Sequence, residues 1–417
     1  MHHPAPAERM TQMKFLCKKL WLPRLAFCTA ALILSLCGTV RYYAASLPDH
    51  FYAESGRDVS VQTLLPVTVR RIEDTAPPMQ SAELRLFGMI PVKTASLTTF
   101  GPVSVYVGGQ PFGIRMLMDG VMIVSLSGIA GADGSVCPAA DAGLEIGDII
   151  LQVNGRPVSS NADLQNAVSE SDGSAVRVTY RRGEQLHTAE IRPLYVPLSQ
   201  RWQTGMWVRD STAGIGTVTY FTHAANGMIA FAGLGHAVCD IDTGEQIPLG
   251  SGDVIAVSVN DIITGSAGKP GELRGKFNTA GRIGTLQANT DCGVFGLLDR
   301  LPQSQMLVPL GYRQDVTRGE ALIYTTIDGT VPQAFTAEIE EIRSDDHSQR
   351  DLVIHVTDPA LLRYAGGIVQ GMSGSPILQN GRLVGAVTHV FVKDPTRGYG
   401  IFAENMFAQT AALAAAA

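Results

Sequence analysis

Short strand-like segments separated by glycines fill the chain from Leu198 onward, and this pattern limits the fold more than any other feature. Apolar residues cluster in brief runs such as Met228 to Phe231 and Gly281 to Leu286. The 417-residue sequence contains 44 glycines, which favour turn-rich β structure over long helices. The pattern predicts an all-β domain, either a sandwich or a barrel, over residues 196–417.

A second module is expected at residues 108–195. Its central run, AGLEIGDIILQVNG from Ala142 to Gly155, resembles a PDZ domain of the bacterial type. The resemblance implies that Phe112, Gly113 and Ile114 hold the carboxylate of a peptide C-terminus with their N–H groups, beside an added peptide strand. An alternative stays open, in which the PDZ unit only packs against its neighbour.

An uncharged apolar run, Leu25 to Val40, marks the N-terminal region, and five Lys or Arg residues precede it. This charge bias predicts a helix whose N-terminal side stays in the cytoplasm while the rest of the chain is exported. A cleaved signal peptide is the alternative. We expect a cytoplasmic tail and transmembrane signal anchor at residues 1–46, followed by a polar linker with some strands at residues 47–107.

Charge and cysteine content argue against several classes of function. The net charge is -6 and the body of the chain has no block of Lys or Arg, so nucleic-acid binding has no electrostatic support. No Cys or His spacing indicates a zinc site, and we expect neither a metal nor a cofactor. Three of the six cysteines lie beyond the apolar run, and a Cys239–Cys292 disulfide stays open.

The loop GMSGSP, from Gly371 to Pro376, has the composition that a nucleophilic serine requires. A catalytic serine needs a tight turn that exposes its Oγ, and an oxyanion hole formed by nearby backbone N–H groups. Gly371 and Gly374 allow the necessary backbone angles. We therefore predict Ser373 as the nucleophile, with the N–H groups of Gly371 and Ser373 as the oxyanion hole.

The base that this serine needs is expected to be His236, which follows a strand and stands among small residues. A base early in the domain and a nucleophile late in it match the chymotrypsin-like arrangement of two β-barrels, each supplying one partner. The third member is open from the residues alone, because Asp358 and Asp291 are about equally well placed in sequence. The fold class is thus mainly β, with an anchor, a PDZ domain and a two-barrel serine peptidase domain.

Several longer stretches resemble the SpoIVB peptidase family of endospore-forming bacteria. They are Gly235–Gly244, Thr357–Pro359, Gly366–Ile377, Val384–Val392 and Asp394–Ile401. The resemblance implies His236 as the base, Ser373 as the nucleophile and Asp358 as the acid. It therefore favours Asp358 over Asp291.

The same resemblance implies a role in proteolytic signalling across the forespore membrane. The enzyme would act between forespore and mother cell, cutting a regulatory partner of an intramembrane protease and thereby activating a late sigma factor. It would also cut itself, with residues 49–90 as the accessible segment. Two alternatives are a non-catalytic PDZ adaptor and an HtrA-like quality-control protease, although HtrA proteins usually place the PDZ domain after the protease.

Overall fold

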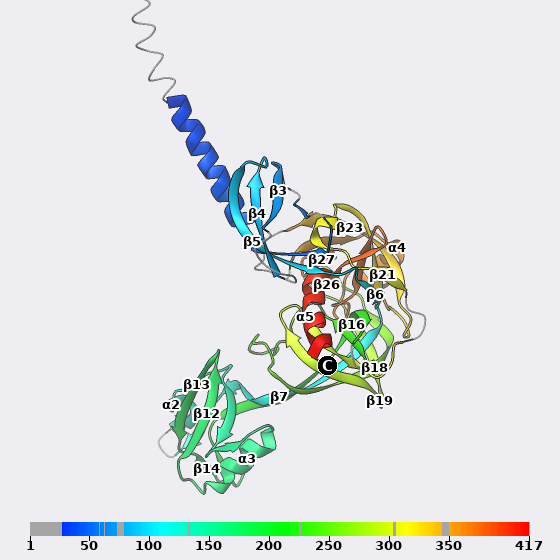
Figure 1. Ribbon diagram of the computed structural model, residues 1–417. Coiled ribbons are helices and arrows are strands. Elements are labelled where there is room, and N and C mark those ends of the chain that lie inside the picture. Colours follow the sequence, from blue (N-terminus) through cyan, green and yellow to red (C-terminus); the bar gives the residue numbers. More distant parts are fainter. Residues whose placement is uncertain are drawn as a thin grey trace, which may run out of the picture. The chain divides into compact units, whose positions relative to one another are not determined.

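The computed structural model describes residues 27–57, 59–61, 63–72, 79–131, 134–224, 227–302, 306–343 and 350–416 (Figure 1). These residues form two compact units that divide near residue 101. The first unit contains the N-terminal helix and a small sheet, and the second contains the PDZ fold and two β-barrels. The basic residues ahead of the apolar run lie outside the described residues.

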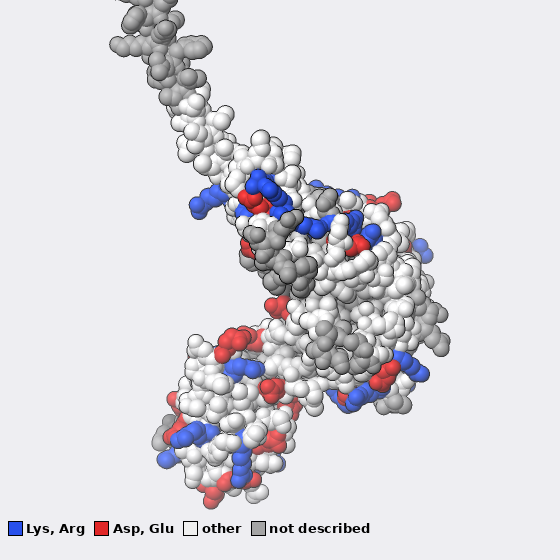
Figure 2. Space-filling view, in the orientation of Figure 1, with Lys and Arg blue, Asp and Glu red and all other residues white. Residues whose placement is uncertain are grey.

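The first unit begins with the helix Phe27–Ser46, which is long and apolar enough to be a membrane anchor or a signal sequence. Its most apolar window has a mean hydropathy of 1.3 and is only 6% buried. Figure 2 shows the helix surface as white over most of its length, because it carries no Lys, Arg, Asp or Glu there. Its length and apolar surface are those of a membrane-spanning helix.

The segment expected to be a linker forms a five-stranded sheet with its own core. The strands are β1 (His50–Glu54), β2 (Ser60–Val61), β3 (Val67–Ile72), β4 (Met79–Leu86) and β5 (Ile90–Phe100), in the order β1-β5-β4-β3-β2. Phe51, Leu84 and Leu97 are fully buried in this core, which also includes Tyr43 of the helix and Leu47 just after it. Alternating apolar residues, rather than a continuous run, supply this core.

The first β-barrel is a ring of six strands. They are β7 (Pro111–Leu126), β16 (Met206–His223), β17 (Ile229–Gly233), β18 (Leu249–Ile263), β19 (Glu272–Thr290) and β20 (Gly293–Leu298). The order is β7-β18-β19-β20-β17-β16, and the pairing of β7 with β16 closes the ring. Two short strands, β6 (Ser104–Val107) and β21 (Leu307–Pro309), continue the sheet beyond β16.

The second β-barrel also has six strands. They are β22 (Gly319–Thr325), β23 (Gln333–Ile342), β24 (Leu352–Val356), β25 (Pro376–Gln379), β26 (Arg382–Phe391) and β27 (Asp394–Phe402). The short helix η1 (Arg313–Asp315) precedes its first strand, and α4 (Pro359–Ala365) connects β24 to β25. The C-terminal helix α5 (Ala403–Ala416) contacts β17 of the first barrel and β26 of the second. The predicted mainly β fold with a barrel-type protease domain is confirmed.

The PDZ fold has the sheet order β13-β12-β10-β7, so it shares β7 with the first barrel. Its elements are β8 (Ile129–Gly131), β9 (Gly134–Val136), α2 (Pro138–Asp141), β10 (Ile149–Val153), β11 (Arg156–Pro157), α3 (Asn161–Glu170), β12 (Val176–Arg182), β13 (Gln185–Ile191), β14 (Leu194–Val196) and β15 (Arg201–Gln203). Val121 and Ile123 of β7 belong to the PDZ core. The predicted PDZ domain is present, but its core begins near residue 121 rather than 108.

The structure corrects the predicted peptide-binding loop. Phe112, Gly113 and Ile114 lie in the barrel half of β7, where they pair with β16 on one edge and with β18 on the other. Phe112 and Ile114 are buried in the barrel core. With both edges paired and both side chains buried, these residues have no free edge to which a peptide strand could be added.

Candidate active site

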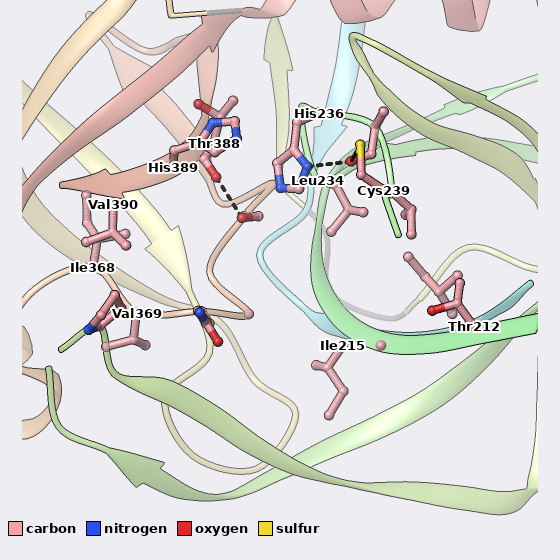
Figure 3. Close-up of a pocket in the computed structure, with 18 of the residues that line it drawn as sticks. Thr212, Ile215, Leu234, His236, Cys239, Ile368, Val369, Thr388, His389 and Val390 are labelled. Carbon is pink, nitrogen blue, oxygen red and sulfur yellow. Dashed lines mark hydrogen bonds between the residues drawn. The ribbon is translucent and has the colours of Figure 1, made fainter. Parts of the chain in front are cut away.

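A pocket of about 440 Å³ contains His236 and Ser373 (Figure 3). Its walls come from β16, from the loop after β17, from the segment 368–373 and from β26. Most of the lining side chains are apolar, and among the described residues that line it none is Asp, Glu, Lys or Arg. The structure thus brings the predicted base of the first barrel and the predicted nucleophile of the second to one cavity.

The loop that carries Ser373 is fastened to the first barrel by two buried threonines of β16. Thr217 donates from its N–H to the carbonyl of Ser373 at 2.9 Å and from its hydroxyl to the carbonyl of Gly371 at 2.8 Å. Thr219 donates from its hydroxyl to the carbonyl of Gly374 at 2.8 Å. Sequence reasoning missed both threonines, because nothing local marks a contact with a loop some 150 residues further along.

Gly374 must be glycine for the loop to approach β16 this closely. Its φ is +94°, and a Cβ there would collide with the carbonyl oxygen of Thr217 and the backbone nitrogen of Leu234. The tight approach agrees with the expectation that small residues shape this turn. It also explains how the loop is held against a barrel to which it does not belong.

The backbone around Ser373 leaves two N–H groups unpaired among the hydrogen bonds of the described residues, those of Gly371 and Ser373. The carbonyl of Gln370 accepts from Leu273 N at 2.8 Å, and the carbonyl of Met372 accepts from Ser375 N at 2.9 Å. Because the C=O and N–H of a trans peptide point in opposite directions, these bonds turn both N–H groups the other way. An oxyanion hole is built from unpaired backbone N–H groups of this kind.

The hydroxyl of Ser373 donates to the carbonyl of Thr388 at 2.7 Å in this conformation (Figure 3). The proton that a base would remove is therefore directed at a neutral backbone oxygen. The hydroxyl must turn away from this oxygen before it can donate to an imidazole.

His236 leaves β17 through two residues with left-handed backbone angles, Leu234 at φ 65° and Gly235 at φ 70°. Its Nδ1 lies 2.8 Å from the carbonyl oxygen of Ala237. Because a carbonyl oxygen only accepts, the proton must be on Nδ1, and Nε2 keeps its lone pair. Burial lowers the pKa of His236, although the bond to Ala237 partly opposes this effect.

A second histidine of the pocket, His389 on β26, stacks obliquely against His236 with ring centroids 4.8 Å apart (Figure 3). Burial, the neighbouring His236 and Arg350 together lower the pKa of His389 to about 4. His389 is therefore neutral at physiological pH.

Neither predicted acid lies against His236. Asp358 is the N-cap of α4, and its carboxylate accepts from the N–H groups of Ala360 at 2.8 Å, Leu361 at 3.3 Å and Thr336 at 3.2 Å. Burial would raise the pKa of Asp358, but these bonds lower it below its usual value. Asp291 is exposed; burial and, after it, the charge of Asp291 raise the pKa of the Cys239 thiol. Asp358 thus has a structural role here, as a helix cap.

One cysteine, Cys239, lines the pocket. Cys239 and Cys292 are both free thiols, so the disulfide left open by the sequence is not formed. Within the part of the chain that the structure describes, no three His, Cys, Asp or Glu side chains gather as metal ligands would.

Comparisons with known families agree with this architecture. Residues 200–407 match the model of the family described as SpoIVB peptidase S55. Residues 135–182 match the model of a PDZ domain.

Comparisons with individual proteins cover smaller parts of the chain. A protein from Neisseria meningitidis named as a zinc metalloprotease is 36% identical over 74 residues, which is 18% of this chain and 17% of that protein. The serine protease Do-like HtrA of Lactococcus lactis is 43% identical over 56 residues, which is 13% of this chain and 14% of that protein. The chain therefore spans less than a fifth of the length of either relative.

Two solved structures are also similar in part. The PDZ domain of an SdrC-like protein from Listeria monocytogenes is 24% identical, with a TM-score of 0.18, and covers 22% of this chain and 87% of that one. The inactive form of the Rv3671c protease is 15% identical, with a TM-score of 0.27, and covers 48% of this chain and 83% of that one.

Proposed function

Because the chain belongs to the SpoIVB peptidase family, we propose that it is a serine endopeptidase in which Ser373 is the nucleophile and His236 the general base. The observation that carries this proposal is the meeting of these two side chains in one pocket, from two different barrels. The apolar lining suits an extended substrate with neutral side chains near the scissile bond.

The reaction begins when the Ser373 hydroxyl turns from Thr388 O towards Nε2 of His236. Oγ attacks the substrate carbonyl as Nε2 takes the proton, and the N–H groups of Gly371 and Ser373 stabilise the oxyanion. The imidazolium then gives its proton to the leaving amine. A water molecule repeats the sequence on the acyl-enzyme and releases the free acid.

The orienting role that an aspartate has in many serine proteases falls, in our proposal, to the carbonyl of Ala237. It fixes the tautomer of His236 by accepting from Nδ1–H. A neutral carbonyl stabilises the imidazolium less than a carboxylate does, so we expect slow turnover of the kind that suits regulated cleavage.

The biological role that we propose is sporulation signalling. The enzyme is held in the forespore membrane by the helix Phe27–Ser46 and acts in the space between forespore and mother cell. There it cleaves itself and a regulator of an intramembrane protease, which leads to activation of a late sigma factor. Family membership and an N-terminal apolar helix followed by PDZ and peptidase domains support this role.

An HtrA-like quality-control protease is the second candidate, favoured by the similarity to the Do-like HtrA of Lactococcus lactis. A quality-control enzyme degrades many unfolded proteins, whereas a signalling enzyme cuts few sites. Incubation of the purified full chain with unfolded casein distinguishes the two candidate functions, because only a quality-control protease should degrade casein extensively.

The proposed function is tested by comparing the N-termini of wild-type and Ser373→Ala chains, purified under identical conditions and sequenced by mass spectrometry. Wild type should acquire a new N-terminus in its exported part, while Ser373→Ala should keep the original one. Identical processing of both chains would contradict Ser373 as the nucleophile.

A further inference from the structure

In the PDZ fold, the edge of the Val121–Leu126 half of β7 is covered by a strand of the chain itself, which also contacts α3. We call the place between this edge and α3 the PDZ groove. In PDZ domains an extended peptide is added as an antiparallel strand along such an edge. Here the first residues of β16 take that place, with Met206 opposite Leu126 and Arg209 opposite Met122. The pairing is antiparallel, as it would be for a bound peptide.

The side chains of this strand alternate as those of a bound peptide would. Met206 and Val208 pack against the PDZ core. Trp207 points the other way, is 65% exposed and donates from Nε1 to the Ser127 hydroxyl at 2.9 Å. At the end of the strand, Asp210 accepts from the N–H of Asn161, the first residue of α3, at 2.8 Å.

Arg209, the last residue of this pairing, reaches the loop that carries the catalytic base. Its guanidinium binds the carboxylate of Asp240 and, at 2.6 Å, that of Asp242. Asp240 is only 2% exposed, and its Oδ1 also accepts from the N–H groups of Asp242 at 3.0 Å and Thr243 at 2.9 Å. Asp240 follows His236 by four residues, so this buried ion pair fastens the end of the base loop to the PDZ groove.

We infer that Met206–Arg209 is an internal ligand of the PDZ domain and that Arg209 is a positioning residue for the base loop. This inference rests on the proposed function. The PDZ groove then does not recruit substrate. A free peptide that enters the groove has to displace the strand, release Arg209 from Asp240 and so lower peptidase activity.

The test uses the full chain in detergent and measures the rate at which a fluorophosphonate probe labels the nucleophile. Arg209→Met should lower this rate roughly tenfold to a hundredfold, as a small displacement of a catalytic group does. Arg209→Lys keeps the positive charge but cannot bind Asp240 and Asp242 together as the guanidinium does, so the probe should label this variant at an intermediate rate. The matched control is Arg177→Met, which removes an exposed ion pair with Glu190 elsewhere in the PDZ domain and should label like wild type.

The pH profile of labelling distinguishes positioning from a general loss of structure. The titratable neighbours of His236 are His389 on β26 and Cys239 on its own loop. A loosened base loop gives His236 more water, so the midpoint of the profile in Arg209→Met should move to higher pH. Labelling of Arg209→Met at the rate of Arg177→Met, with the same midpoint, would overturn the inference.

If Arg209→Met folds poorly, hydrogen exchange of the wild-type protein tests the inference without any variant. In wild type the backbone amides of 206–209 should be protected as strongly as those of β10, and rapid exchange there would show that the groove is not stably filled. Ser373→Ala distinguishes a failure of the nucleophile assignment from a failure of the internal-ligand inference. If that variant is labelled like wild type, the nucleophile assignment fails; if it is not, the Arg209 results test the internal ligand alone.

Discussion

At the scale of single residues, His236 has the tautomer of a general base without an aspartate beside it. The Ala237 carbonyl holds the proton on Nδ1 of His236, while the carboxylate of Asp358 caps the N-terminus of α4. The sequence motif around Asp358 is the same for either role, since Asp followed by Pro also starts a helix well. The sequence therefore could not show that Asp358 caps a helix, and spacing alone placed Asp358 and Asp291 about equally well.

Asp358→Asn tests these two roles. Asn caps a helix about as well as Asp, so the free energy of unfolding should fall by only about 1 kcal/mol, for the lost bond to Thr336 N. The rate of fluorophosphonate labelling should stay within about tenfold of wild type. A loss of roughly 10⁴, as follows removal of an orienting carboxylate, would show that Asp358 reaches His236 during turnover.

The pH dependence of the labelling rate should reflect a neutral, buried base. The rate rises with pH as His236 loses its proton and then levels off, and burial lowers the pKa of His236. We therefore expect half-maximal labelling below the ordinary value of roughly 6.5 for histidine. A midpoint clearly above that value would indicate a carboxylate that stabilises the protonated form.

At the scale of elements, β16 links the parts of the catalytic domain. Its start fills the PDZ groove, its middle lines the pocket, and Thr217 and Thr219 near its end hold the nucleophile loop. A single strand of this length therefore connects three functions. The position of the loop depends on hydrogen bonds from the opposite barrel.

Thr217→Val should weaken both stability and chemistry. Valine keeps the shape but removes the hydroxyl that binds the Gly371 carbonyl, leaving a buried acceptor unpaired at a cost of about 1–3 kcal/mol in unfolding free energy. The labelling rate should fall because the loop is less well held. Chemical denaturation and probe labelling measure the two effects.

Thr325→Val is the matched control, because Thr325 is fully buried and its hydroxyl has no partner among the described residues. It should leave both stability and labelling close to wild type. Equal losses in the two variants would mean that the Thr217 bond contributes nothing specific.

Strands, the glycine loop and the PDZ motif could be predicted because their signals are local in sequence. The division of β7 between the barrel and the PDZ fold could not, because it depends on which distant strands pair with each half. The same limit explains the misplaced peptide-binding loop at Phe112, whose pattern of alternating apolar residues fits either domain. The β1–β5 sheet was underestimated because few residues of its strands are buried, as in the 11-residue β5, where only Ala95 and Leu97 are buried.

At the scale of the whole molecule, we propose that the apolar helix anchors the enzyme in a membrane. Leu34 lies within the helix Phe27–Ser46 and is 71% exposed. Leu34→Arg adds about 3 kcal/mol to the cost of insertion, so less of the chain should sediment with membranes after alkaline extraction. Leu64→Arg, at a site 96% exposed in the β1–β5 unit, should leave membrane association unchanged. Equal sedimentation of both variants would argue against the helix as an anchor.

The central claim is that Ser373 is the nucleophile of a serine peptidase. Mass spectrometry of the full chain after reaction with diisopropyl fluorophosphate tests it most directly, because Ser375 in the same loop is an internal control whose side chain is fully buried. We predict a single adduct on Ser373, which disappears when the protein is unfolded before reaction. An adduct on Ser375 or on any other serine, or no adduct on the folded chain, would contradict this account.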